Sequence, residues 1–336
     1  MNGKQRILNM IGGAPVDRLP FMPITMMFAG DVAGIRYGDY ARDHRKLVEA
    51  QLRVAETFGA DHVSAISDPA REASDLGATI EWFDDQPPAI NESRALLEDK
   101  AKLAALQIPD PLAGRRMSDR VAGIALLAEK AGSTHLVEGW IEGPVAMAAD
   151  LRGVNTLMLD FHDDPEFVRD LFMYVVEMEF QFAKAQVEAG ATLMGIGDAA
   201  ASLIGPKLYE KFVFAEERRL IERVRGLGVP VRLHICGNTR RIAVLMARTG
   251  AEIIDLDFLT PLDEARAVSG PDQVLLGNID PVRALRDGTP ESVTAALEQC
   301  WQAAGPRWIV SAGCEVPRGT PHENLMAMKR FAGTRS

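Results

Sequence analysis

Two side chains that can bind a metal, His234 and Cys236, stand two residues apart, and a second thiol follows at Cys314. Residues i and i+2 of a β-strand point to the same side, so a strand here would present the imidazole and the first thiol together. One imidazole and two thiolates suit zinc, and three protein ligands leave a fourth position open for substrate or water. This pattern is typical of a catalytic zinc site.

The same residues can also be interpreted as ordinary core. Cysteine is among the most buried residue types, Cys314 is distant in the sequence, and the chain has no Cys-x-x-Cys motif. Spacing alone does not decide between the two interpretations. If zinc is bound, a thiol at the open position would lose its proton, and the thiolate would be a nucleophile suited to alkyl transfer.

Polar side chains at the ends of other candidate strands could act beside such a metal. Asp257 is the nearest candidate for an oxygen ligand or a catalytic group, although it could equally hold a loop through backbone N–H groups. Asp198 is the second catalytic candidate and could contact the substrate. The candidates for substrate binding are Met26, Phe28, Asp68, Glu142 and Asn278.

Two weaker patterns remain. Residues 195–200 (GIGDAA) are similar to the dinucleotide signature GxGxxA, but Pro206 follows in place of a continuous helix, so we expect no nicotinamide site. Met26 and Phe28 belong to an apolar cluster that could line a pocket or simply fill the core.

Eight short apolar runs alternate with helical patterns along the chain. The runs are residues 19–25, 61–67, 135–141, 192–197, 231–236, 252–257, 273–278 and 307–312. Each has the length of a strand buried on both faces. The alternation predicts an α/β fold, a (β/α)8 TIM barrel with catalytic groups at the C-terminal ends of its strands. An open doubly wound sheet is the alternative.

We expect one barrel domain over residues 1–336 with two additions. The first is an N-terminal helix that ends at residues 12–15. The second is the less regular, proline-containing segment 72–120, which we interpret as an insertion after the second strand that covers the barrel mouth.

Composition excludes several classes of protein. The 336 residues include 37 Lys and Arg against 47 Asp and Glu, and a net charge of −10 does not favour nucleic-acid binding. No apolar run has the length of a membrane helix, and the N-terminus does not resemble a signal peptide. We therefore expect a cytoplasmic protein whose three cysteines are thiols, with Cys300 packing in a helix.

Several segments resemble the uroporphyrinogen decarboxylase superfamily, and within it the zinc- and corrinoid-linked methyltransferases that act between methylcobalamin and coenzyme M. They are HICGNT (234–239), EIIDLD (252–257), LLGNIDP (275–281) and SAGCEVPRGTPHENLMAM (311–328). The resemblance implies a (β/α)8 barrel with zinc held by His234, Cys236 and Cys314. Asp257 falls near the place of an added acidic ligand in the related cobalamin-independent methionine synthases.

Two departures narrow this resemblance. True decarboxylases carry an arginine-rich segment after the first strand, whereas residues 23–34 (PITMMFAGDVAG) contain no arginine to bind substrate carboxylates. The chain also has no DxHxxG signature of a corrinoid-binding domain. A separate corrinoid protein would therefore supply the cobalamin.

The sequence thus predicts a zinc-dependent methyltransferase that exchanges a methyl group between a corrinoid protein and a small thiol, methoxy or methylamine substrate. One alternative is a metal-free lyase like uroporphyrinogen decarboxylase, with Asp68 or Asp198 orienting the substrate. The other is a non-catalytic partner that delivers the corrinoid protein.

Overall fold

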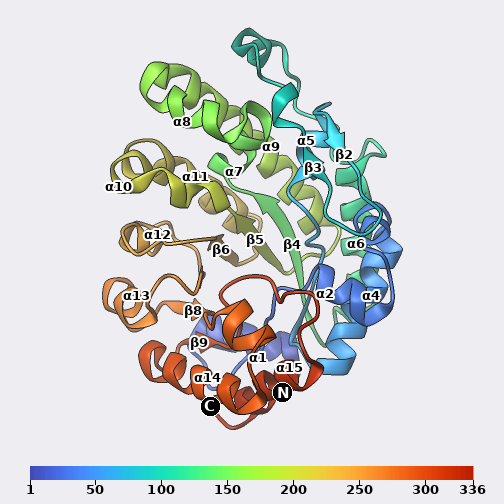
Figure 1. The fold of residues 1–336 in the computed structure, drawn as a ribbon, viewed down its shortest axis with the longest axis vertical. Coiled ribbons are helices and arrows are strands. Elements are labelled where there is room, and N and C mark those ends of the chain that lie inside the picture. Colours follow the sequence, from blue (N-terminus) through green and yellow to red (C-terminus); the bar gives the residue numbers. More distant parts are fainter. Residues whose placement is uncertain (336) are drawn as a thin grey trace.

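The computed structural model describes residues 1–335, and within them seven parallel strands form one curled sheet of order β1-β4-β5-β6-β7-β8-β9. The strands are β1 (His62–Ser64), β4 (Leu136–Glu142), β5 (Leu193–Gly197), β6 (Val231–Ile235), β7 (Ile253–Leu256), β8 (Val274–Leu276) and β9 (Trp308–Ile309). Figure 1 shows the helices arranged around the outside of this sheet. Seven of the eight predicted runs therefore contain strands, in the predicted order.

The helices fall mainly where the amphipathic patterns lie. They are α1 (Gly3–Gly12), α2 (Met27–Ala33), α3 (Tyr37–Arg42), α4 (His44–Phe58), α5 (Ala70–Asp75), α6 (Arg116–Ala131), α7 (Pro144–Arg152), α8 (Val154–Asp163), α9 (Pro165–Glu188), α10 (Gly205–Leu208), α11 (Phe214–Arg225), α12 (Ala243–Met246), α13 (Leu262–Ser269), α14 (Pro290–Ala304) and α15 (His322–Gly333). The N-terminal helix is as predicted, and Asn2 caps it by accepting a hydrogen bond from the Gln5 N–H. None of the helices within residues 1–335 is long and apolar enough to cross a membrane.

The first predicted strand, residues 19–25, departs from the expected barrel. It forms a single bridge, between Phe21 and Val310, because Pro20 and Pro23 have no N–H to donate to a ladder. The segment still bonds to both ends of the sheet. The Val310 N–H donates to Pro20 O at 2.9 Å, and the Asp61 N–H donates to Phe21 O at 2.9 Å. An irregular segment thus lies between β9 and β1, where a regular eighth strand was predicted.

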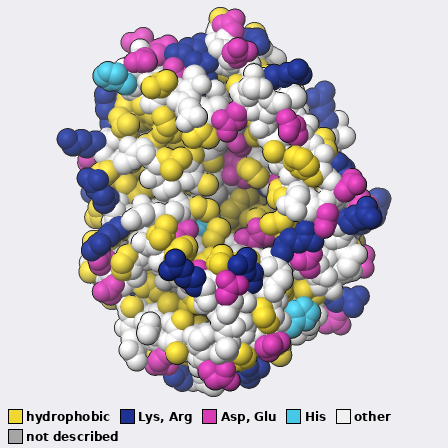
Figure 2. Space-filling model, viewed as in Figure 1, with side chains coloured by type: hydrophobic (Ala, Val, Ile, Leu, Met, Phe, Trp, Pro, Cys, Tyr) yellow, Lys and Arg dark blue, Asp and Glu magenta, His cyan; other side chains and the backbone are white. Residues whose placement is uncertain are grey.

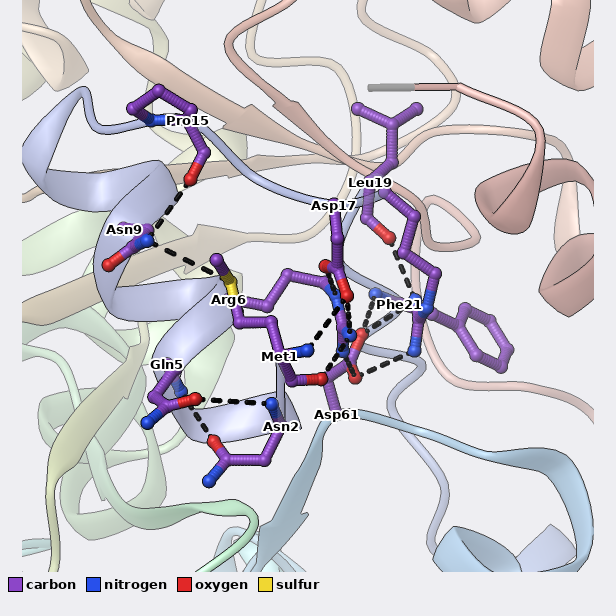
Figure 3. Close-up of polar contacts among 11 residues, drawn as sticks. Met1, Asn2, Gln5, Arg6, Asn9, Pro15, Asp17, Leu19, Phe21 and Asp61 are labelled. Atoms are coloured by element: carbon purple, nitrogen blue, oxygen red, sulfur yellow. Dashed lines mark hydrogen bonds and ion pairs between the residues drawn. The ribbon is translucent and has the colours of Figure 1, made fainter.

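One buried carboxylate attaches this segment and helix α1 to the sheet (Figure 3). Asp61, directly before β1, accepts Arg6 Nη1 at 2.5 Å and Arg18 Nη1 at 2.9 Å. It also accepts the backbone N–H of Phe21 at 2.8 Å. The closing segment therefore depends on the Asp61 side chain as well as on backbone hydrogen bonds.

The segment 72–120 is only partly irregular. It contains a short antiparallel hairpin, β2 (Ile80–Glu81) with β3 (Ala89–Ile90), and 3-10 turns at Glu92–Arg94 and Lys100–Ala105. The hairpin turn reaches two other parts of the chain. Asp85 accepts the Tyr37 N–H at 2.9 Å through its side chain, and its carbonyl accepts Arg318 Nη1 at 2.9 Å.

Candidate active site

The structure brings the three predicted metal ligands together. His234 lies on β6, Cys236 follows that strand directly, and Cys314 lies in the loop after β9. His234 Nε2 is 3.0 Å from Cys236 Sγ, and the two Sγ atoms are 3.7 Å apart. One ligand atom from each residue lies within 4.8 Å of the others.

These donors fit a tetrahedral zinc ion. Two zinc–sulfur bonds of about 2.3 Å at a tetrahedral angle separate the sulfur atoms by about 3.8 Å, close to the observed 3.7 Å. The 3.0 Å between His234 Nε2 and Cys236 Sγ is the length of a hydrogen bond. A bound metal would take the place of the proton in this bond. Three protein donors also leave the fourth position open.

A buried carboxylate orients the imidazole. Asp255 Oδ2 on β7 lies 3.0 Å from His234 Nδ1, and it also accepts Arg232 Nη2 at 2.7 Å. A carboxylate at Nδ1 keeps the ring proton on that side and leaves Nε2 as the metal ligand. The sequence prediction missed Asp255 and Arg232. The alternation that selected His234 and Cys236 would have found Arg232, two residues earlier on the same strand.

The electrostatics of the cluster favour a thiolate. A hydrogen bond from Cys236 and the charge of His234 lower the pKa of Cys314, although burial opposes this. Burial also disfavours the charge on His234, but Asp255 and Cys236 raise its pKa well above the ordinary value. Cys314 is therefore the thiol of this cluster that ionises most easily.

A cavity of about 220 Å³ adjoins the three ligands. Its apolar lining comes from Ile24, Met26, Ile66, Pro69, Pro87 and Trp140, and its polar lining from Tyr37, Ser67, Asp68, Arg71, Glu142 and Glu315. Figure 2 shows a hollow near the centre of this face, with hydrophobic side chains in its depth and charged side chains around it. The cavity thus combines a metal-binding corner with mainly apolar walls.

The indole of Trp140 explains the two glycines of the GIGDAA segment. A Cβ atom on Gly195 would lie 2.3 Å from Trp140 Cε3, and one on Gly197 would lie 3.0 Å from Cζ2. The glycines allow the indole to lie flat across strand β5. This packing is a structural reason for a motif that only superficially resembles a dinucleotide signature.

Both predicted substrate-binding carboxylates, Asp68 and Glu142, line the cavity, and each is held by an arginine. Glu142 Oε1 accepts Arg71 Nη2 at 2.9 Å, while Asp68 accepts Arg116 through both oxygens, at 2.8 and 2.7 Å. Burial raises the pKa of Glu142 to about 8, against the opposing charge of Arg71. Met26, the apolar candidate, also lines the cavity.

The predicted catalytic carboxylates lie elsewhere. Asp257 accepts the backbone N–H groups of Gly237 and Leu259, both at 2.9 Å, which is the loop-holding arrangement given above as its alternative. Asp198 is fully buried and accepts the Ala146 N–H at 2.6 Å at the start of α7. Neither residue is among the groups that could hold the metal or among those lining the cavity.

Two predicted substrate-binding residues also lie outside the cavity. The Phe28 ring packs against Phe58, with ring centroids 5.6 Å apart. The Asn278 side chain donates to the backbone carbonyls of Asp257 at 3.0 Å and Thr260 at 2.7 Å. Both residues therefore have structural roles: Phe28 packs in the core, and Asn278 holds the loop after β7.

Sequence reasoning missed several cavity residues. Glu315 follows Cys314 directly and accepts the Met27 N–H at 2.8 Å, and burial raises its pKa to about 7. Its position beside a candidate ligand was a signal that could have been used. Trp140 stands two residues before Glu142 on β4, so strand alternation places both on one side. Arg71 lies on helix α5 three residues after Asp68, a predicted substrate-binding residue, and this proximity was a signal that could have been used.

Comparison with known proteins identifies the family of this chain. The model of the family described as uroporphyrinogen decarboxylase (URO-D) matches residues 2–334. The methylcobamide:CoM methyltransferase MtbA of Methanosarcina mazei is 29% identical over 336 residues, covering 98% of this chain and 97% of that protein. A uroporphyrinogen decarboxylase of Myxococcus xanthus is 26% identical, covering 90% of this chain and 87% of its own length.

Solved structures show the same fold. A methyltransferase from Methanosarcina mazei superposes with a TM-score of 0.90 at 23% identity, covering 99% of this chain and 98% of its own. A B12-independent methionine synthase from Shewanella sp. W3-18-1 gives 0.59 at 14% identity, covering 87% and 86%. The family match extends over nearly the whole sequence. The chain therefore belongs to the uroporphyrinogen decarboxylase (URO-D) family.

Proposed function

We propose that this protein is a zinc-dependent methyltransferase that exchanges a methyl group between a corrinoid protein and a small substrate. The observation that carries the proposal is the opening of the His234, Cys236 and Cys314 cluster onto the apolar cavity. The relative named a methylcobamide:CoM methyltransferase supports the reaction class. A bound zinc would supply Lewis acidity to a thiol, methoxy or methylamine group at its open position.

The protein's own residues would bind and orient that group. His234, Cys236 and Cys314 would hold the metal, and Asp255 would fix the imidazole. Trp140 and its apolar neighbours would exclude water from the methyl group. Asp257 and Asp198 act in this proposal through the loops and the helix start that they hold, so they are positioning residues.

The cavity favours a substrate of low charge. Its walls are mainly apolar, and Arg71, the cation that lines it, already binds Glu72 at 3.0 Å and Glu142 at 2.9 Å. An anionic group would share the single positive charge of Arg71 with two buried carboxylates, although both of them bind Nη2, while Nε and Nη1 have no partner among residues 1–335. A neutral thiol or methyl ether would not need such a partner.

The corrinoid would approach from outside. A corrin ring with its side chains is much larger than a cavity of about 220 Å³, so it must be presented at the mouth. This geometry agrees with a separate corrinoid protein as the partner. We further propose that the hairpin of segment 72–120 covers part of the mouth, since Pro87 lines the cavity.

The proposal is tested by metal content and methyl transfer in the same preparation. We expect about one zinc per chain in the wild type and a loss of zinc in Cys314→Ala. Cys300→Ala is the matched control, because its thiol lies 3.8 Å from Asn278 and outside the metal cluster. The zinc-loaded wild type should demethylate methylcob(III)alamin with a neutral thiol, and Cys314→Ala should not.

Two outcomes would overturn the proposal. Protein that takes up no zinc under reducing conditions, yet releases carbon dioxide from a porphyrinogen, would be a metal-free lyase. Protein that binds a corrinoid protein equally well as wild type and Cys314→Ala, with no methyl transfer by either, would be a delivery partner.

A further inference from the structure

A group of buried ionisable side chains lies behind one wall of the cavity. We call Arg71, Glu72, Glu142, Asp150 and Glu179 the carboxylate cluster; they come from α5, β4, α7 and α9. The exposed fractions of Arg71, Glu72 and Glu179 are 1%, 0% and 0%. The cluster therefore contains four carboxyl groups and one cation, and Arg71 and Glu142 line the cavity.

Several atoms of the cluster have no hydrogen-bond partner among residues 1–335. They are Arg71 Nε and Nη1, Glu72 Oε2, Asp150 Oδ2, and both Glu179 carboxyl oxygens. Buried polar atoms in proteins are nearly always bonded, so this concentration is unusual. A buried carboxylate without a partner is also costly. Four carboxyl groups around one guanidinium therefore favour the protonated form of the carboxyl groups that lack a cation.

We propose that Glu142 is the catalytic residue that exchanges a proton with the substrate heteroatom during methyl transfer. This inference rests on the proposed function and adds the proton donor and acceptor that such a reaction needs. Glu142 is suited to the task because it lines the cavity, while Arg71 binds one of its two oxygens. Its neighbours in the cluster make the neutral form the stable one.

The chemical step balances with Glu142 as the proton source. In the demethylating direction, the bond between the methyl carbon and the heteroatom breaks, and its electron pair stays on the heteroatom. The heteroatom takes the proton from Glu142, which becomes a carboxylate. The electron pair of the new carbon–cobalt bond comes from the reduced corrinoid, which is oxidised by two electrons. In the reverse direction, the Glu142 carboxylate takes the proton that a thiol loses.

The charges facing Glu142 support this assignment. Burial is the largest influence and raises the pKa of Glu142 to about 8, Arg71 opposes it, and Glu72 and Asp198 raise it further. The pKa values of Glu179 and Asp150 are also raised by burial and by their negative neighbours. Glu142 is therefore mainly protonated at neutral pH and ionises within a range that an enzyme can use.

The first test measures protonation without metal or substrate. Infrared spectra of the wild type at neutral pH should show a carbonyl band of protonated carboxyl groups that shifts in deuterium oxide. Glu142→Gln should lose part of this band, and the lost part should titrate near pH 8 in the wild type. Glu56→Gln, an exposed position on α4, should lose none of it. An unchanged band in Glu142→Gln would overturn the proposal.

The second test counts protons on zinc-loaded protein, with 2-mercaptoethanol as the probe thiol. Calorimetric titration in two buffers of different ionisation enthalpy gives the number of protons released. At about pH 9, the wild type should release almost none, because ionised Glu142 accepts the thiol proton, whereas Glu142→Gln should release about one. Equal release by both proteins would contradict the proposal.

Failure of the proposed function would look different, because then the wild type itself would neither bind the thiol nor transfer a methyl group. If the function holds, Glu142→Gln should slow methyl transfer about 100-fold and lose the change in rate near pH 8. Should Glu142→Gln not fold, Glu142→Asp keeps the carboxyl group, and its protonated band should remain while the rate falls.

Discussion

Nδ1 of His234 lies 3.0 Å from Oδ2 of Asp255, a fully buried carboxylate on the neighbouring strand. The two residues are direct partners in the register of β6 and β7, so the sheet itself sets the contact. Arg232 also binds this carboxylate, because its Nη2 donates to Asp255 Oδ2 at 2.7 Å. The protein itself therefore orients the imidazole.

Asp255→Asn should weaken zinc binding by about 10- to 100-fold, because an amide cannot support the ring proton as a carboxylate does. Competition with a chromophoric chelator would measure the affinity. Asp257→Asn is the comparison, since its side chain holds the loop beside Cys236 through the Gly237 N–H, and it should weaken the affinity less than Asp255→Asn does. If Asp257→Asn weakened binding as much as Asp255→Asn, the assignment of the two carboxylates would be reversed.

Asp61→Ala should lower the free energy of unfolding by about 3–5 kcal/mol, because it leaves two arginines without their buried partner. Urea denaturation would measure the loss. The nearby Asp17 also binds Arg6, but its side chain is 41% exposed, so Asp17→Ala should cost less than about 1 kcal/mol. Equal losses would show that the closing segment does not depend on Asp61.

Asp68→Asn should also destabilise the fold, by about 1.5–3 kcal/mol at pH 7, because it removes the carboxylate that carries the charge opposite the partly buried Arg116. Although burial opposes it, the charge of Arg116 holds the pKa of Asp68 below its ordinary value of 3.8. A lowered pKa gives stability that is present above pH 3.8 and is lost as the pH falls through the lowered value.

The difference between the wild type and Asp68→Asn should therefore shrink as the pH falls below 3.8. Denaturation at pH 7 and at several acidic values would follow it. Asp39→Asn, whose side chain is half exposed beside Lys46, provides the comparison and should have little effect. A difference that is constant with pH would mean that Asp68 acts by packing alone.

Gly195→Ala should push Trp140 toward the cavity, because the added Cβ would lie 2.3 Å from the indole. Such overpacking costs about 1–3 kcal/mol, and the narrowed cavity should raise KM more than it lowers kcat. Tryptophan fluorescence and steady-state kinetics would report the two effects. Gly12→Ala, which meets no atom within 4 Å, is the control and should change neither.

Much of the fold could be predicted because the strands are short, apolar and separated by helical patterns. The prediction was less accurate where prolines or side-chain hydrogen bonds interrupt a segment that the hydrophobic pattern predicts as a strand or a helix. Pro20 and Pro23 interrupt the first strand. The segment between β6 and β7 forms only a short helix, Ala243–Met246, and the Thr239 N–H before it donates to the Thr260 side chain.

The metal ligands could be proposed from spacing, but the orientation of carboxylates at strand ends could not. Asp255 contacts the His234 imidazole and Asp257 binds backbone N–H groups, although they stand two residues apart. Strand alternation no longer applies beyond Leu256, where β7 ends. The contact between Arg71 and Glu142 joins helix α5 to strand β4, which are distant in sequence, so no local sequence pattern could predict it.

The 3.7 Å between Cys236 and Cys314 also bears on how the protein is assembled. Two thiols so close, one of them readily ionised, are open to oxidation to a disulfide, which would remove both sulfur donors at once. A bound metal would shield them from this reaction. In the newly made chain, metal binding and oxidation would therefore compete for the same two thiols.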